Sequence, residues 1–221
     1  MELLDRPVQL TATTAPHREA FGMRLFCYVV ARDYGFAPNP FHGYCTLATC
    51  KPKIRGSAQV GDWIIGAGSS NYRLAGHLVF AMEVSEVLSF DEYWKDPRFE
   101  VKKPQFNSSL MKAYGDNIYH FSKTKGRWIQ EDSHHSRGGG RPNRANISHD
   151  TQVSRVLVGQ KFIYFGGGGP MIPKRLRKAD GPSLCGGRGH RNRFPPRFVA
   201  AVVRWLEALP VRGFAGKPAE F

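Results

Sequence analysis

The sequence predicts an α+β fold with a β-rich core and a C-terminal helix. Apolar runs rich in β-branched and aromatic residues occur at 25–30, 63–68 and 78–84, and such runs are typical of buried strands. The chain has 24 glycines and 15 prolines among 221 residues, which indicates many turns between short elements. Between Phe198 and Leu209, apolar residues recur at helical spacing after two prolines, which predicts a helix.

Turn signals separate these elements. The 63–68 run follows Gly61-Asp62 and the 78–84 run follows Ala75-Gly76, so we expect an antiparallel hairpin with both arms in the core. A short helix is expected from Phe90 to Trp94, capped by Ser89 or Asp91.

Two more strands are expected at 153–158 and 162–165, within the glycine- and arginine-rich part of the chain. Residues 43–50 fit a strand or a helix equally well.

The positive charge is concentrated in one part of the chain. The net charge is +14, and residues 121–197 carry 16 basic and 4 acidic side chains, whereas residues 1–120 carry 13 and 12. This distribution favours a polyanionic partner such as nucleic acid, although a solvated basic face would look the same. We expect an N-terminal extension at 1–22 and a single domain at 23–221, whose working surface is the basic insert 121–197.

The compartment is expected to be the cytoplasm. The sequence has no apolar run long enough to cross a membrane and no signal-peptide pattern at its start, so no membrane partner is expected. Cys27, Cys45, Cys50 and Cys185 form no CxxC pair, and a disulfide framework is not expected. We expect these cysteines to be buried as small apolar residues.

The order of features between residues 51 and 101 resembles a known class of small barrels. Lys51-Pro52 is followed by the Gly61-Asp62 turn, the strand after it, the apolar strand from Leu78 to Val87 and the acidic segment ending in Asp96-Pro97. This order resembles the PUA-like superfamily, the EVE-type members in particular. The resemblance implies a β-barrel core that binds modified bases of RNA or DNA in a pocket beside the Gly-Asp strand.

A longer pattern resembles a more specific family. It comprises Cys27–Val30 with Asp33, Gly35–Pro40, Thr46–Arg55 and Gly61–Ser69, and it is similar to the second family named nucleotide modification associated domain, over about residues 23–185. This resemblance implies a role around modified nucleotides in phage and bacterial systems that alter DNA bases, with no established reaction. The ligand-binding residues that the resemblances imply are Asp33, Lys51, Arg55, Gly66, Gly68 and Ser69.

A polar loop at 128–151 offers candidate chemistry. It holds Asp132, His134, His135 and Asp150, which are candidate catalytic residues because histidine exchanges protons near neutral pH. Asp132, His134 and Asp150 could also hold a metal, but their spacing matches no zinc signature, and we expect no metal or cofactor. A third interpretation is ligand binding by Trp128, Asn143 and Asn146, and a fourth is an ordinary surface loop.

Glycine-rich segments near the end of the insert suggest contact with phosphates. The run Gly166–Gly169 lacks the Gly-Lys-Ser/Thr ending of a P-loop, and Gly186–Arg193 resembles an RGG segment. The residues expected to contact a nucleic-acid backbone are Arg137, Arg141, Lys174, Arg175, Arg177, Arg188, Arg191 and Arg193.

Three functions therefore remain open. The first is a protein that recognises or handles modified nucleobases, in DNA more than in RNA, within a DNA-modification or anti-phage setting. The second is an enzyme that acts on a nucleobase or nucleotide through the loop 128–151. A structural role beside partner proteins of a modification system is a third. Convergence of Asp132, His134, His135 and Asp150 with the glycine-rich loops on one pocket would favour the enzyme, and side chains that point to solvent in different directions would count against it.

Overall fold

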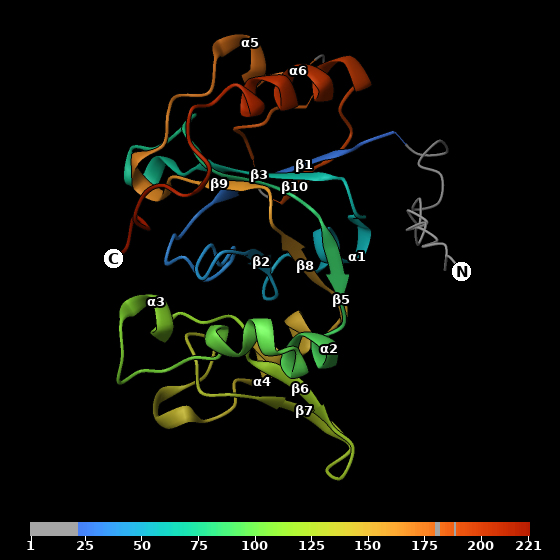
Figure 1. The fold of residues 1–221 in the computed structure, drawn as a ribbon, viewed down its shortest axis with the longest axis vertical. Coiled ribbons are helices and arrows are strands. Elements are labelled where there is room, and N and C mark those ends of the chain that lie inside the picture. Colours follow the sequence, from blue (N-terminus) through green and yellow to red (C-terminus); the bar gives the residue numbers. More distant parts are fainter. Residues whose placement is uncertain (1–21, 180–181, 188) are drawn as a thin grey trace, which may run out of the picture.

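The structure is a computed structural model that describes residues 22–179, 182–187 and 189–221, and these form four layers along the long axis of the molecule (Figure 1). A helical layer lies at one end, followed by a six-stranded sheet, a three-stranded sheet, and a last layer of helices and a hairpin. The predicted extension 1–22 falls outside the described residues except for Gly22.

The six-stranded sheet is mixed and has the strand order β10-β1-β3-β4-β9-β11. β1 pairs with β3 in parallel, and β3 pairs with β4 antiparallel. The bounds are β1 Leu25–Val30, β3 Trp63–Gly68, β4 Leu78–Glu83, β9 Phe162–Tyr164, β10 His190–Arg191 and β11 Gly213–Phe214. The predicted hairpin of β3 and β4 is therefore confirmed, and both arms are buried.

The second sheet is antiparallel, with the order β2-β8-β5. Its strands are β2 Cys45–Leu47, β5 Glu86–Leu88 and β8 Val156–Gly159. The segment left open between strand and helix thus contains a short strand. A separate hairpin pairs β6 Tyr119–Ser122 with β7 Arg127–Gln130.

Most helices are short. The α-helices are α1 Pro52–Ser57, α2 Phe90–Lys95, α3 Leu110–Ala113, α4 Arg144–Asp150, α5 Lys174–Arg177 and α6 Pro196–Glu207. Turns of 3₁₀-helix occur at Ser70–Tyr72, Pro97–Lys102, Gly138–Gly140 and Gly166–Gly168. α2 begins at the predicted cap, where the Ser89 hydroxyl accepts from the Glu92 N–H and Glu92 accepts from the Ser89 N–H. No helix in the described part of the chain is long and apolar enough to cross a membrane.

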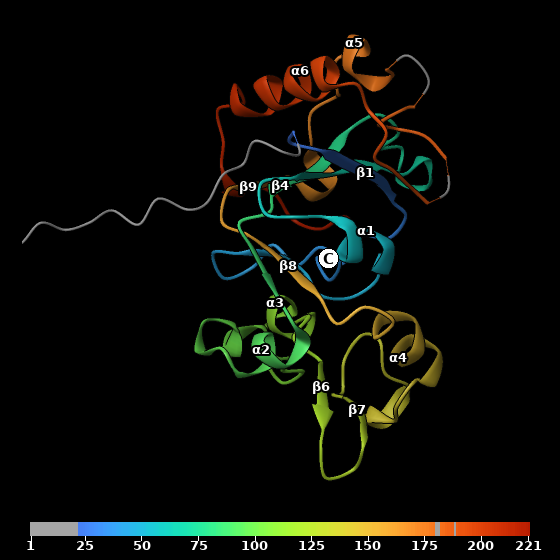
Figure 2. The same ribbon diagram turned by 90° about the vertical axis from the view of Figure 1, so that its right-hand side faces the viewer.

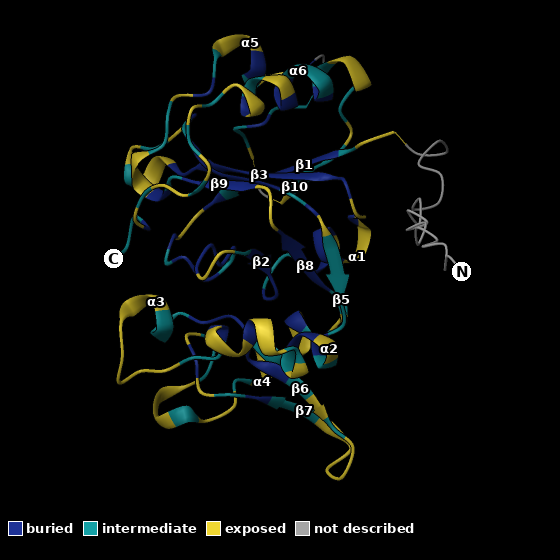
Figure 3. Cartoon of the chain, viewed as in Figure 1, coloured by how far each residue is buried: buried dark blue, intermediate teal, exposed yellow. Residues whose placement is uncertain are grey.

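Strand alternation explains how the layers stack. Leu25 and Cys27 of β1 face α6, whose Val199 and Val202 are buried against the same cluster. Phe26 and Tyr28 face the other way and pack against the second sheet. A third cluster joins the far side of that sheet to α2 and β6. The sheets are accordingly buried while the outer faces of the helices are exposed (Figure 3).

The expectation of α+β structure is confirmed, but the described strands form no closed barrel. The larger sheet ends at β10 on one side and β11 on the other, and no described pairing joins them. The interior between the two sheets is filled by side chains that bridge them, including Phe80 and Leu157. The β-barrel expected from the PUA-like and EVE-like resemblance is replaced here by two stacked open sheets.

The basic insert 121–197 does not form one surface. Strands β8 and β9 carry the chain from the lower layers into the upper sheet. The hairpin β6–β7 and α4 therefore lie at one end of the molecule and α5 at the other, in both views (Figures 1 and 2). The expectation of a single working surface over the whole insert is wrong, because the insert contains two core strands.

Arg55 of α1 braces the lower part of the fold. Its side chain is fully buried, and it donates to the carbonyls of Cys50 (2.8 Å), Asp150 (2.5 Å), Val153 (2.8 Å) and Arg155 (2.6 Å). Burial lowers the pKa of this guanidinium to about 10. Arg55 thus fixes the turn before α1 to the end of α4.

We expect Arg55→Met to lower the free energy of unfolding by about 3 to 5 kcal/mol, because four buried carbonyls lose their donor. Arg98→Met is a matched control, since Arg98 binds Glu86 and Asp96 at the exposed surface, and its loss should cost about 1 kcal/mol or less. Urea unfolding of both variants measures the difference. Equal losses would contradict the bracing role.

Candidate functional site

The turn between β2 and α1 holds two consecutive residues in the left-handed backbone conformation. Cys50 has φ 57° and Lys51 has φ 42°. Non-glycine residues adopt this conformation at a cost of about 1–2 kcal/mol each, and they cluster at functional sites. A strained turn between a strand and a helix also carries the nucleophile of the α/β-hydrolases. The local geometry therefore directs attention to Cys50.

Cys50, His135 and Asp150 form a connected row. The Cys50 Sγ lies 3.6 Å from His135 Nε2, and His135 Nδ1 lies 2.9 Å from Asp150 Oδ2. The three side chains lie within 4.8 Å of one another. A nucleophile, an imidazole and a carboxylate in this order match the arrangement of catalytic triads, in which the acid orients the imidazole and the imidazole activates the nucleophile.

The carboxylate of Asp150 is held from several sides. Asp150 is the last residue of α4 and is fully buried. Its Oδ1 accepts from the Cys50 N–H (2.8 Å), and its Oδ2 accepts from the Tyr119 hydroxyl (2.9 Å) in addition to His135. These bonds hold the Asp150 carboxylate in the position in which it orients the His135 imidazole.

His135 is positioned through its backbone. Its carbonyl accepts from Gln130 Nε2 (3.2 Å) and Asn146 Nδ2 (2.8 Å), and its N–H donates to the Ser133 hydroxyl (3.3 Å). Gln130 ends β7 and also accepts from the Asn143 N–H. The hairpin and α4 together thus set the place of the imidazole.

The electrostatics of the row favour a charged imidazole. Burial lowers the pKa of His135, but its hydrogen bonds to Asp150 and Cys50 outweigh burial and raise this pKa to about 9. Burial alone would raise the pKa of Asp150, yet the bond and charge of His135 lower it. His135 is therefore protonated and Asp150 ionised at neutral pH. A cationic imidazole beside a cysteine stabilises a thiolate.

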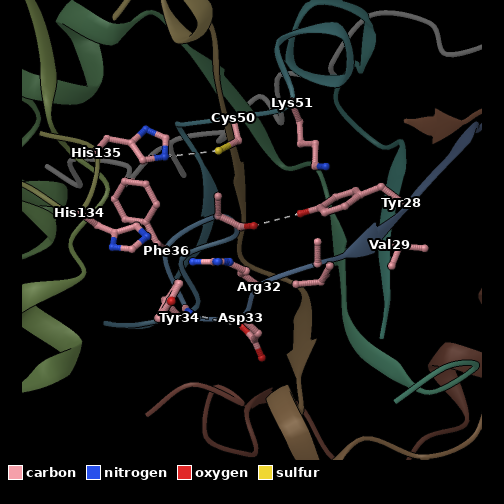
Figure 4. A pocket seen from close by; sticks show the side chains of 14 residues that line it. Tyr28, Val29, Arg32, Asp33, Tyr34, Phe36, Cys50, Lys51, His134 and His135 are labelled. Atoms are coloured by element: carbon pink, nitrogen blue, oxygen red, sulfur yellow. Dashed lines mark hydrogen bonds between the residues drawn. The ribbon is translucent and has the colours of Figure 1, made fainter. Parts of the chain in front are cut away.

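The row opens into a pocket of about 260 Å³. Figure 4 shows Cys50 and His135 on one wall, with Phe36 between the two histidines, and Tyr28 and Lys51 across from them. Phe36 has its ring 5.3 Å from His134 and 4.7 Å from His135. The remaining wall comes from the end of β1 and the loop after it, residues 29–37. The pocket is thus an aromatic recess with a thiol at its edge.

Several predicted residues meet at this pocket. His134, His135, Lys51 and Asp33 line it, and Asp150 lies directly behind His135. Burial lowers the pKa of His134, which packs against Tyr34 with 4.6 Å between ring centroids. The buried carboxylate of Asp33 accepts from the Tyr164 hydroxyl and the Ala219 N–H, and burial raises its pKa.

Other predicted residues lie elsewhere. Asp132 is exposed and accepts from the Ser136 hydroxyl (2.6 Å). Asn143 caps α4 and Asn146 binds the His135 carbonyl, so both support the site from behind. Trp128 packs edge-on to Phe90 and Phe121. The structure therefore brings part of the 128–151 loop to the pocket and leaves the rest as support.

The ligand-binding residues that the resemblance implied lie in different surroundings. Arg55 is occupied by backbone carbonyls, as described above. Gly66 is packed so tightly that an added Cβ would lie 2.3 Å from the Phe80 ring. Gly68 and Ser69 line a second hollow, which Lys51 also lines.

The predicted backbone-contact residues are spread over the molecule. Arg137 and Arg141 flank the 3₁₀ turn near α4, whereas Lys174, Arg175 and Arg177 form α5 at the opposite end. Arg191 lies in β10, at the edge of the larger sheet, and Arg193 follows it. Arg188 lies outside the described residues.

Sequence reasoning missed Cys50. The expectation that the cysteines are buried apolar residues holds for Cys27 and Cys45 but is wrong for Cys50 and Cys185, which are half-buried. The available signal was the position of Cys50 directly before Lys51-Pro52, where a helix begins after a turn. That signal gains meaning only when His135 lies beside the thiol.

The metal interpretation based on Asp132, His134 and Asp150 is not supported by the described residues. The group that lies close enough to hold an ion consists of Cys50, His135 and Asp150. Both Asp150 oxygens already accept hydrogen bonds from this chain, and one of these donors is the imidazole itself. The donor set therefore fits a hydrogen-bonded row better than a set of metal ligands.

The raised pKa of His135 makes stability depend on pH. Because this pKa rises from 6.5 to about 9 on folding, the bound proton stabilises the fold fully below about pH 6.5, and this contribution is lost as the pH rises through about 9. We expect His135→Gln to lower the free energy of unfolding by about 2 kcal/mol at pH 6–7. The loss should shrink above pH 9.

Chemical denaturation between pH 6 and pH 10 measures this change. His149→Gln is the matched control, since His149 lies one residue before Asp150 and is exposed; it should have little effect at any pH. A loss in His135→Gln that stays constant up to pH 10 would show that the pair is not charged.

A comparison with known families places the chain. The pattern of the family described as nucleotide modification associated domain 2 matches residues 22–221, which includes every residue of the row and the pocket. No curated protein and no solved structure matches the chain. The family description supports a role in the context of nucleotide modification. The chain belongs to the nucleotide modification associated domain 2 family.

Proposed function

We propose that this protein is a thiol enzyme that acts on a nucleobase or nucleotide during nucleotide modification, with Cys50 as the nucleophile. The observation that carries the proposal is the row from Cys50 Sγ through His135 to Asp150 at the edge of an aromatic recess. The family supports the nucleotide context. DNA remains the polymer we expect, and a reducing cytoplasm would keep the thiol available.

The first step follows from the geometry. The Cys50 thiolate, paired with the imidazolium of His135, forms a bond from Sγ to an electrophilic carbon of the substrate. The electron pair displaced from that carbon moves to its attached oxygen or nitrogen. The imidazolium then returns its proton to that atom, so that charge and protons balance. Asp150 keeps Nδ1 protonated throughout and thereby holds the imidazole in the required orientation.

The pocket suits a planar heterocycle. Phe36, Tyr28 and Tyr34 line it together with His134, and aromatic walls bind bases through stacking worth about 1–3 kcal/mol per base. His134 lies beside the thiol row with a lowered pKa, so it is neutral and able to accept or donate a hydrogen bond at a base edge.

Recognition of a modified base without chemistry is the second candidate. The same aromatic recess supports it, because a reader of bases needs the walls and not the nucleophile. It gives no reason for the alignment of Cys50 with His135, nor for the left-handed turn that presents the thiol. These features favour the enzyme.

Selective reactivity of Cys50 is the first expected outcome. Iodoacetamide should alkylate Cys50 roughly tenfold or more faster than Cys27 and Cys45 at pH 7, because Cys27 and Cys45 are buried and burial raises the pKa of the Cys27 thiol to about 12. His135→Gln should slow this alkylation roughly tenfold, and His149→Gln should not. Peptide mass spectrometry resolves the sites. If Cys50 is alkylated at the same rate in His135→Gln as in the wild type, His135 does not activate the thiol.

Covalent chemistry on a nucleotide is the second expected outcome. Nucleotides and oligonucleotides carrying modified bases are incubated with the protein, and intact mass spectrometry follows the adduct on Cys50 and the change in the base. Cys50→Ala should abolish both, and Asp150→Asn should slow turnover by roughly 10⁴-fold, as loss of the orienting acid does in other triads. Turnover by Cys50→Ala, or tight binding of modified bases with neither adduct nor product, would replace the enzyme with the reader.

A further inference from the structure

A second hollow of about 420 Å³ adjoins the pocket at Cys50. The two share Val29, Ala31 and Lys51 in their linings. The second hollow continues along Gly68, Ser69 and Ser70, beyond the end of β3. A ligand longer than one base can therefore extend from the thiol past Lys51 into this space.

Lys51 lies at the junction of the pocket and the second hollow. Its Nζ lies 4.4 Å from the centroid of the Tyr28 ring, and the Tyr28 hydroxyl donates to the Ala37 carbonyl, which fixes the ring. Among the described residues, no carboxylate lies within 4 Å of the Lys51 ammonium. Burial lowers the pKa of Lys51, so the charge is held at a cost that an anionic ligand would offset.

The surroundings of the second hollow are positive. Burial lowers the pKa of His190, and the charges of Lys53, Lys51 and Arg191 lower it further, so these three cations act on one region. None of the described residues that line the hollow is acidic. Lys51 is the one cation among the described lining residues, and a recess with a cation in its lining and further cations nearby attracts anions and raises their local concentration.

The lining also offers hydroxyl donors. The Ser69 oxygen accepts from the Asn71 N–H (3.2 Å), which leaves its hydroxyl hydrogen to donate outward. Ser70 is exposed beside it. A lysine ammonium together with serine hydroxyls is a donor set that suits phosphate oxygens.

We propose that the second hollow is a phosphate subsite, in which Lys51 and the hydroxyls of Ser69 and Ser70 hold the phosphate of a nucleotide whose base lies beside Cys50. This inference rests on the proposed function for the position of the base. It makes the substrate a phosphorylated nucleotide, free or within a strand, and not a free base or nucleoside. Lys51 thereby distinguishes substrates by their phosphate, while Cys50 reacts with the base.

The test measures binding in a protein that cannot react. In the Cys50→Ala background, calorimetry compares a nucleoside, its 5′-monophosphate, a short single-stranded oligonucleotide and inorganic phosphate. We expect the monophosphate to bind at least tenfold more tightly than the nucleoside. Lys51→Met should remove that advantage and leave the affinity for the nucleoside within twofold. Lys53→Met is the matched control for charge: Lys53 is exposed in α1 and does not line the hollow, so its loss removes a nearby charge without removing a contact. It should change the monophosphate affinity less than threefold.

The outcomes separate the two proposals. Equal affinity for nucleoside and monophosphate, or equal effects of Lys51→Met and Lys53→Met, would overturn the phosphate subsite, even if Cys50 forms adducts. Binding of phosphate that depends on Lys51 in a protein whose Cys50 forms no adduct would support the subsite and overturn the enzyme. Tighter binding of the oligonucleotide than of the monophosphate, with the same dependence on Lys51, would identify a strand as the source of the phosphate.

Discussion

The buried carboxylate of Asp150 is the charge around which the lower half of the molecule is arranged. A carboxylate without water costs several kcal/mol unless hydrogen bonds and opposite charge compensate it. Here the compensation comes from three separate parts of the chain: the Cys50 N–H before α1, the Tyr119 hydroxyl on β6 and the imidazole of His135 after β7. Satisfying this one group therefore brings the thiol and the imidazole together.

Arg55 serves the same region with the opposite charge. Its guanidinium binds the carbonyls of Cys50 and Asp150, so the backbone of both residues is fixed from one side and the Asp150 side chain from the other. A cysteine in the left-handed backbone conformation requires a restraint of this kind, because strain of about 1–3 kcal/mol per residue persists only where the surroundings determine the conformation. Rigid support also keeps the Sγ–Nε2 distance short enough for proton transfer.

The sequence predicted the elements that depend on local pattern and missed those that depend on tertiary contact. β3, β4 and α6 were predictable because their burial leaves a periodic or continuous apolar run in the sequence. The expected barrel and the expected single basic surface were wrong for a different reason. Strand order is decided by pairing between distant segments, and β8 and β9 carry the insert through the core. A count of charges along the chain cannot detect that crossing.

The candidate site divides in the same way. His135 and Asp150 were expected because they lie in one polar loop, whereas Cys50 lies 85 positions from His135. Its place before Lys51-Pro52 indicates a turn and a helix start but not a reactive thiol. Neighbouring side chains point to opposite faces in a strand, but His134 and His135 follow β7 in a turn, and both line the pocket.

Charge around the thiol argues against a purely structural role for the turn. Three cationic side chains, His135, Lys51 and Arg32, line one half-buried pocket. The Asp33 carboxyl group in the same lining is bound by Tyr164 and the Ala219 N–H, and Asp150 lies behind His135. Partial burial of His135 and Lys51 costs free energy that negative charge offsets. The arrangement becomes favourable when negative charge forms or binds between them, as a thiolate at Cys50 or as a phosphate beyond Lys51. The proposed thiolate and the proposed phosphate would both place an anion among these cations, so the two proposals rest on the same electrostatic feature of the pocket.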